Sequence, residues 1–459
     1  MLRCHVMDQG YDHHGVHACP QTIGRHFRAP HRLSSVSPIE LDYRLSRHTL
    51  DNGMHVVINH DPNAPGEALN IWYRVGSADE EPGATGFAHL FEHLMFTGSA
   101  QVGASEHLAT IESIGGSANA TTSFDRTNYF ETVPPGALDL ALWLEGERLG
   151  SLTVSDESFA TQREVVKEEK RQRYDNVPYG DLQDLIIELN FPGDHPYGHL
   201  PIGSMADLDA ATPDQARAFF HRWYRPNNAY LTLSGPVDPD EALASVNRYL
   251  GGLDAGDIDE QVIRGLPPHE GLPSLEVTRD APSSMVHLCW RTPAYADRDH
   301  LIVEQALAVL ASGQSSRLPD LLVRQRQIAD SVGSGDFSLA RGVSLAVLSG
   351  RVAPGHDVKE LSEALVTEVA RLCDEGPNEA EIERINAGFD RAWLSRLASI
   401  DERADEISSM ACLLGDPGEI NRLMGRIHQI SAEDITAAAR RWLAPEHRSV
   451  LIYNAKEAR

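Results

Sequence analysis

The pattern of hydrophobic and polar positions indicates an ordered fold that begins near Tyr43. A tight Asn52-Gly53 turn leads into the apolar run at residues 55–58, which predicts a strand after a turn. Residues 68–75 predict a second strand, and helical periodicity starts around Gly86. Strands arrive in pairs and helices in runs, which favours a largely antiparallel or mixed sheet covered by helices.

A sequence signature in the first part of the chain occurs again in the second part. Its matching residues are all separated by the same number of positions as Thr212 and Ser431, and this separation is called the repeat offset below. The signature is a helix N-cap, an Arg-Trp pair, a proline and a strand, found at Thr212, Arg222, Trp223, Pro226 and residues 230–233, and again at Ser431, Arg441, Trp442, Pro445 and residues 450–452. Ser and Thr caps alone are common, but agreement of all four features indicates a duplication.

We therefore predict an α+β fold of two homologous domains, each a mostly antiparallel sheet covered by helices. The N-terminal domain is expected at residues 41–255 and the C-terminal domain at 270–459, joined by a Gly-, Pro- and Asp-rich linker at 256–269. Residues 1–40 are expected to be a disordered extension or the product of a misassigned start codon. A metal site of their His and Cys residues and a mitochondrial transit segment are the alternatives.

Charge and apolar content exclude some partners. The formal net charge of -27 argues against nucleic acid or an anionic membrane as the main partner, because both need a positive surface. No run approaches the roughly 18 apolar residues needed to span a bilayer.

Five widely spaced cysteines without a CxxC pair indicate neither a disulfide framework nor a thiolate zinc site. A reducing compartment, the cytoplasm, is the simplest expectation; the periplasm and the mitochondrial matrix are alternatives.

Residues 85–98 predict one helix that ends at a glycine, and this helix carries the main candidate chemistry. Its apolar stripe consists of Phe87, Leu90, Phe91, Leu94 and Met95. His89, Glu92 and His93 lie on a different face. The i, i+4 spacing places the two imidazoles about 6 Å apart at their Cβ atoms, within reach of one ion.

This is the H-x-x-E-H arrangement of zinc peptidases. Zinc accepts imidazole and carboxylate ligands in a tetrahedral site that keeps one position open, and it polarises a scissile carbonyl while a nearby carboxylate moves the proton. Glu92 is the candidate for that carboxylate. The alternative is an amphipathic helix whose solvated polar face happens to hold two histidines.

A third ligand is expected from another helix, and the segment 156–174, with Ser155 as N-cap, is the candidate. Glu169 shares a face with Val165 and Val166 and is expected to point inward. Glu168 lies further round, beside other charged residues, on what we expect to be a solvated face.

Five motifs together resemble the pitrilysin or insulinase family, specifically its half-length subunits such as mitochondrial processing peptidase and bacterial relatives. The motifs are residues 89–93 (HLFEH), 115–122 (GGSANATT), 163–169 (REVVKEE), 195–198 (HPYG) and 224–228 (YRPNN). The family's third zinc ligand follows the second histidine by 76 positions, which is Glu169 here. The resemblance implies one zinc ion per subunit, held by His89, His93 and Glu169, with Glu92 as general base.

The resemblance also implies substrate-binding residues. Asn119 and Ala120 lie in a segment similar to the strand that holds a peptide by β-augmentation in these enzymes; the alternative for Asn119 is a turn after Gly115-Gly116. Active full-length relatives present an arginine and a tyrosine from their C-terminal half. Arg324 lies in the region of that arginine, but Asp330 or its neighbour stands where the tyrosine is expected.

We therefore expect a zinc metalloendopeptidase that hydrolyses short or unfolded polypeptides within a chamber formed by paired subunits. A heterodimer with a homologous subunit is the expected assembly, and a homodimer is second. The alternatives are a non-catalytic assembly or core-type subunit and a zinc-binding module without catalysis. Relatives of the core type typically lose the zinc residues, whereas all four are present here.

Overall fold

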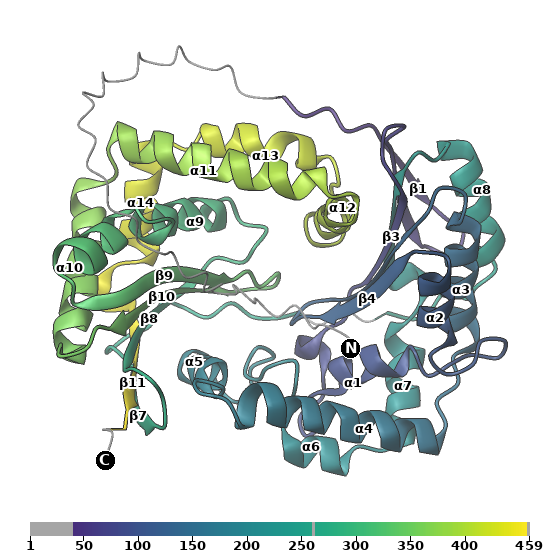
Figure 1. Ribbon diagram of the computed structural model, residues 1–459, viewed down its shortest axis with the longest axis horizontal. Helices are drawn as coiled ribbons and strands as arrows, with labels where there is room; N and C mark the ends of the chain where they lie inside the picture. Colours follow the sequence, from purple (N-terminus) through teal and green to yellow (C-terminus); the bar gives the residue numbers. More distant parts are fainter. Residues whose placement is uncertain (1–39, 259–261, 457–459) are drawn as a thin grey trace, which may run out of the picture.

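A computed structural model describes residues 40–258 and 262–456, arranged around two mixed sheets (Figure 1). The prediction for residues 1–40 therefore lies, apart from Glu40, outside the described residues. The first sheet contains, from edge to edge, β1 (Leu45–Thr49), β2 (His55–His60), β6 (Ala229–Gly235), β3 (Glu67–Tyr73), β5 (Thr127–Val133) and β4 (Ser117–Thr122). The second contains β7 (Ser274–Arg279), β11 (Ser449–Ala455), β8 (Met285–Thr292), β10 (Ser344–Val352) and β9 (Ala329–Phe337).

The two sheets have the same topology. Leaving out β1, the order β2-β6-β3-β5-β4 corresponds strand by strand to β7-β11-β8-β10-β9. In each sheet the first of these pairs is parallel and the other pairs are antiparallel. The predicted α+β class with two homologous, mostly antiparallel units is confirmed.

The repeat offset also holds for helices. It relates α7 (Pro213–Trp223) to α14 (Ala432–Trp442), and the short helix η3 (Pro226–Asn228) to η5 (Pro445–His447), at both ends of each element. The two predicted N-caps are present: Thr212 accepts a hydrogen bond from the Gln215 amide, and Ser431 accepts one from the Asp434 amide.

Helices of the same half cover the outer face of each sheet (Figure 1). On the first sheet these include α3 (Leu138–Ser151) and α8 (Pro239–Leu250), and on the second α9 (Arg298–Ala311), α10 (Val358–Glu375) and α14. The predicted linker, residues 256–269, lies between α8 and β7. Among the described residues, no helix combines the length and apolar character that crossing a membrane requires.

The inner faces are covered by an exchange of helices between the halves. Helix α12 (Ile400–Leu414), from the second half, packs on β3 and β6 of the first sheet, and α5 (Leu182–Asn190), from the first half, packs on β8 and β11 of the second (Figure 1). Shifting α5 by the repeat offset places it within α12, so the two helices are equivalent in the duplication. The inner face of each sheet is therefore covered by a helix from the other half, and neither half packs as an independent unit.

Polar anchors hold both exchanged helices in place. Asp405 of α12 accepts hydrogen bonds from three side chains of the first sheet, at 2.9, 2.8 and 2.9 Å, which belong to Asn70, Trp72 and Asn128. At the end of α5, the Asn190 side-chain oxygen accepts from Ser449 at 2.8 Å, and its main-chain carbonyl accepts from Arg291.

Candidate metal centre

Helix α1 (Phe87–Leu94) is shorter than the predicted segment 85–98 and is buried along its whole length. His89, Glu92 and His93 are 2%, 0% and 7% exposed. The alternative of a solvated polar face is therefore wrong.

A buried carboxylate fixes the start of α1. Glu80 accepts hydrogen bonds from the amides of Gly86 and Ala88, at 2.9 and 2.7 Å, and a further one from His199 at 2.8 Å. The first amides of a helix have no partner within the helix and carry a partial positive charge, so a carboxylate there both satisfies and stabilises them.

The third candidate ligand comes from α4 (Asp156–Lys170), which begins after Ser155 as predicted and continues into the π-helical turn η2 (Arg171–Asp175). Glu169 Oε2 lies 3.4 Å from His93 Nε2 and 3.7 Å from His89 Nε2. Glu168 is exposed and pairs with Arg171 and Gln172. The structure thus brings Glu169, and not Glu168, to the histidines. The inward face is narrower than predicted, because Val166 is buried but Val165 is 44% exposed.

These three side chains fit a zinc ion. Both ring nitrogens of His89 are buried without a hydrogen-bond partner. Burial, with a further contribution from His93, lowers the pKa of His89 to about 3, so its ring is neutral. Burial acts to raise the pKa of Glu169, but the hydrogen bond to His93 and the positive charge of Arg173 act in the opposite direction, and the pKa is lowered. Neutral imidazole and ionised carboxylate are the forms that bind zinc. Zinc bonds of about 2.0–2.2 Å place the ligand atoms of a tetrahedral site roughly 3.4 Å apart, close to the observed spacing.

Two further residues, which the sequence did not single out, orient the centre. Thr122 of β4 donates a hydrogen bond to Glu92 Oε2 at 2.6 Å, and burial raises the pKa of Glu92. Arg173 forms an ion pair with Glu169 Oε1 at 2.7 Å, which leaves Oε2 toward the histidines. The i, i+4 spacing of Glu169 and Arg173 was a usable signal for this pair. The contact of Thr122 with Glu92 joins a strand to a distant helix, and no local spacing signals it.

The predicted substrate-binding residues lie in different surroundings. Asn119 and Ala120 belong to β4, the edge strand beside α1, so the alternative of a turn asparagine is wrong. The Ala120 side chain is fully buried, which leaves only its main chain for a substrate. Arg324 lies on η4 (Pro319–Gln325), where its Nε donates to Asp320 at 2.8 Å, and none of its described contacts reaches the metal centre. Asp330 is exposed near the start of β9.

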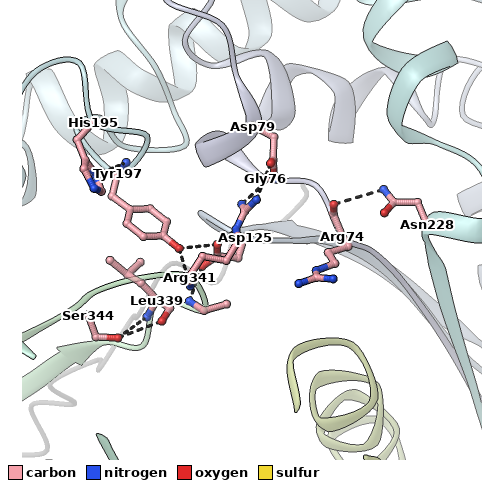
Figure 2. A network of polar contacts seen from close by, with 11 residues as sticks. Arg74, Gly76, Asp79, Asp125, His195, Tyr197, Asn228, Leu339, Arg341 and Ser344 are labelled. Carbon is pink, nitrogen blue, oxygen red and sulfur yellow. Dashed lines mark hydrogen bonds and ion pairs between the residues drawn. The ribbon is translucent and has the colours of Figure 1, made fainter. Parts of the chain in front are cut away.

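Arg341, between β9 and β10, links the second half to the region that supports α1 (Figure 2). Its guanidinium lies 2.8 Å from Asp79 and 2.9 Å from Asp125. Tyr197 donates to Asp125 at 2.7 Å and accepts from the Arg341 amide at 3.0 Å. Asp79 directly precedes Glu80, which holds the start of α1, so a contact from the second half supports the position of the zinc helix.

Comparison with known proteins gives matches along both halves. Residues 55–188, which include all four candidate zinc-site residues, match the family model "Insulinase (Peptidase family M16)". Residues 210–389 match the model "Peptidase M16 inactive domain". The zinc protease PqqE of Helicobacter pylori is 30% identical over 367 residues, which are 78% of this chain and 81% of that protein. An uncharacterized zinc protease of Mycobacterium leprae is 31% identical over 422 residues, 86% of this chain and 89% of that one.

Solved structures give the same result. The crystal structure of a protease from Helicobacter pylori superposes with a TM-score of 0.83 at 26% identity, covering 90% of this chain and 99% of that one. The fold is also that of the periplasmic protease PqqL from Escherichia coli, with a TM-score of 0.74 at 21% identity, where 92% of this chain matches 48% of that one. With its two sheets, its histidine pair on α1 and these relatives, the chain belongs to the insulinase family of zinc peptidases, M16.

Proposed function

We propose that this protein is a zinc metalloendopeptidase that hydrolyses peptide bonds in short or unfolded polypeptides. The observation that carries the proposal is the convergence of His89, His93 and Glu169 beside a buried glutamate, Glu92, next to the edge strand β4. A zinc-binding module without catalysis would not need Glu92 in this place.

Each residue has a distinct part in the proposed reaction. His89, His93 and Glu169 hold the zinc ion, and Arg173 keeps the Glu169 carboxylate turned toward the histidines. Bound zinc supplies a Lewis acid for the scissile carbonyl. Glu92 takes a proton from the attacking water and passes it to the leaving amine, since a positioned carboxylate can act first as base and then as acid. Thr122 keeps Glu92 in the orientation that this transfer needs.

The substrate is proposed to bind as an additional strand along β4. Within the described residues β4 pairs only with β5, so its other edge has main-chain groups that an extended peptide can pair with. This recognition uses main-chain hydrogen bonds and requires an unfolded segment, which is why short or unfolded polypeptides are the proposed substrates.

We further propose that two subunits pair to form the working chamber. The chain matches about half of the length of PqqL, so one chain corresponds to half of that longer protein. From the resemblance to full-length relatives, Asp330 or its neighbour stands where a substrate-facing tyrosine is expected, and Arg324 is engaged with Asp320. A heterodimer, in which a homologous partner supplies the missing Arg/Tyr pair, is therefore preferred to a homodimer.

Replacement of Glu92 tests the catalytic proposal. Glu92→Gln should keep zinc, measured by elemental analysis, while hydrolysis of an unfolded peptide falls by about 10²-fold or more, the scale of general acid-base catalysis. Glu112→Gln, at an exposed position on α2 (Glu106–Ser113), is the matched control and should retain full activity. Undiminished hydrolysis by the zinc-loaded Glu92→Gln protein would refute the proposed mechanism.

The assembly is tested separately. The chain is sized in solution and assayed alone, and then with a homologous chain that lacks the zinc residues. Activity that appears or rises strongly with the second chain supports the heterodimer. Full zinc-dependent activity from a monomer would overturn the paired chamber, and activity from a homodimer would leave the chamber but remove the need for a second kind of subunit. A zinc-loaded chain inactive in every arm would favour the non-catalytic assembly subunit.

A further inference from the structure

A second group of metal-ligating side chains lies in the other half of the molecule. His300 and Glu304 are one turn apart on α9, and Asp336 lies on β9. His300 Nε2 is 3.4 Å from Asp336 Oδ2 and 3.8 Å from Glu304 Oε1. The corresponding spacings at the first centre are 3.4 and 3.7 Å, so the two groups have nearly the same dimensions.

The hydrogen bond on the far side of the His300 ring defines which nitrogen carries the proton. Nδ1 lies 3.2 Å from the main-chain carbonyl of Pro293. A carbonyl can only accept, so Nδ1 is the donor, and in the neutral ring the lone pair is on Nε2. A main-chain carbonyl behind a histidine ring is also the usual outer partner of a metal-bound histidine.

The Nε2 atom of His300 therefore faces two carboxylates without a hydrogen bond. His300 is 2% exposed, and Nε2 is buried and has no hydrogen-bond partner. Burial raises the pKa of Asp336, although His300 acts in the opposite direction. The Asp336 side chain is 10% exposed and the Glu304 side chain 38% exposed, so the group lies at the edge of the buried interior. Carboxylates and an unprotonated ring nitrogen that converge there repel one another unless a cation lies between them.

A comparison within the protein shows how the chain itself can supply such a cation. His107, Glu131 and Glu145 also converge, but Arg148 donates to Glu145 there at 2.9 Å. Within the part of the chain that the structure describes, neither Glu304 nor Asp336 has an ion pair with Lys or Arg. Arg396 and Arg426 line the same cavity, but they pair with Glu406 and Glu419. A positive charge at the His300 group therefore comes from a proton or from a bound ion.

The surroundings leave room for an ion with further ligands. His300 and Glu304 line a cavity of about 360 Å³ between α9 and the helices α11 (Glu379–Ala398), α12 and α13 (Glu419–His428). Its wall also contains the polar side chains of Tyr295, Ser338 and Glu406. Ser338 donates to Asp336 Oδ2 at 2.8 Å, which orients that carboxylate.

We propose that His300, Glu304 and Asp336 form a second, accessory site for a divalent transition-metal ion such as Zn²⁺ or Mn²⁺. A mixed set of one imidazole and two carboxylates suits these ions, because imidazole favours zinc and carboxylates favour manganese. The ion ties α9 to the edge strand β9. The site is not a copy of the first one, because its residues lie on a helix and a strand, α9 and β9, whereas His89, His93 and Glu169 lie on two helices, α1 and α4.

The test uses the full chain with its first site disabled. A His89→Gln/His93→Gln double variant is stripped with a chelator, loaded with Zn²⁺ or Mn²⁺, desalted and analysed for metal, and Co²⁺ is used for visible absorption. We expect about one equivalent of metal, a cobalt absorption band and a higher melting temperature in the presence of metal.

Adding His300→Gln to this background should abolish all three signals. The matched control is His287→Gln, because His287 is equally buried in the same half, also has a buried Nε2 without a hydrogen-bond partner, and has no carboxylate paired with it. Metal bound elsewhere, including by histidines of residues 1–39, cancels in this comparison. Asp336→Asn serves as a second ligand variant if His300→Gln does not fold.

No specific metal in the double variant would mean that a proton alone occupies the group and would overturn the proposal. Equal metal content in the His300→Gln and His287→Gln proteins would overturn it as well. Because the readout is metal content in a protein without its first site, the outcome does not depend on whether the proposed peptidase activity is correct.

Discussion

The two halves share a topology but differ in chemistry. In the first half, α1 and α4 bring together two histidines and a glutamate, and Thr122, Arg173 and Glu80 hold the surrounding groups. In the second half, the cluster of metal-ligating side chains among the described residues is instead His300, Glu304 and Asp336, on α9 and β9. The duplication thus preserved the scaffold and not the ligands.

The comparison also shows what the second half contributes to the first. It supplies α12, which covers the inner face of the first sheet, and Arg341, which binds beside the residues that hold α1. The second half, whose described residues contribute no candidate ligand to this metal centre, therefore still supports it. Four substitutions test how far the first half provides the ligands and the second half supports their position.

The largest effect is expected from Arg341→Ala. The substitution leaves Asp79 and Asp125 buried without their counter-ion, and breaking a buried ion pair costs about 3–5 kcal/mol. The free energy of unfolding in urea should fall by that amount. Arg324→Ala removes an exposed ion pair with Asp320 and should change the stability by less than about 1 kcal/mol. Equal losses in the two proteins would show that the Arg341 contacts stabilise the protein no more than an exposed ion pair does.

The second-largest effect is expected from Glu169→Gln, which removes a proposed zinc ligand from the first half. Zinc affinity should fall by more than about 100-fold, beyond the 10–100-fold typical of an outer partner. Glu168→Gln, one residue away and exposed, should bind zinc as the unsubstituted chain does. Competition with a chelator of known affinity measures both. Unchanged affinity in Glu169→Gln would place the third ligand elsewhere.

A smaller loss is expected from Asp405→Ala, which tests the helix exchange. The change leaves three donors of the first sheet without their acceptor, and unsatisfied buried polar groups cost about 1–3 kcal/mol. Glu402→Ala, at an exposed position on the same helix, is the control. Hydrogen exchange should increase in β3 of the Asp405→Ala protein. Exchange that increases only within α12 would show that the helix contributes little to the first sheet.

The smallest effect is expected from Arg173→Met. Glu169 keeps its place but loses the partner of Oε1, so zinc affinity should fall by about 10-fold, equivalent to about 1.4 kcal/mol. Arg171→Met removes a comparable ion pair from the exposed Glu168 and should leave the affinity unchanged. Equal affinities in the two variants would mean that Arg173 does not position the ligand.

Features that depend on local spacing could be predicted from the amino-acid sequence alone. The repeat of cap, Arg-Trp pair, proline and strand predicted two equivalent units, and the i, i+4 spacing of His89 and His93 predicted a shared ion, because both follow from regular geometry along a chain. Helical periodicity selected Glu169 over Glu168. It was less accurate at the margins: α1 ends at Leu94 instead of Gly98, and Val165 is more exposed than its predicted face implied.

Contacts between distant segments could not be predicted from the sequence and are seen only in the folded chain. Thr122 meets Glu92, Arg341 meets Asp79, and Asp336 meets His300 across separations that no periodic pattern encodes. The exchange of α5 and α12 could not be predicted from the sequence either. The pattern of an amphipathic helix shows that it has an apolar face, but not which sheet that face packs on. The path of the chain in space brings these groups together, and burial then gives their interactions the strength that the same groups lack in water.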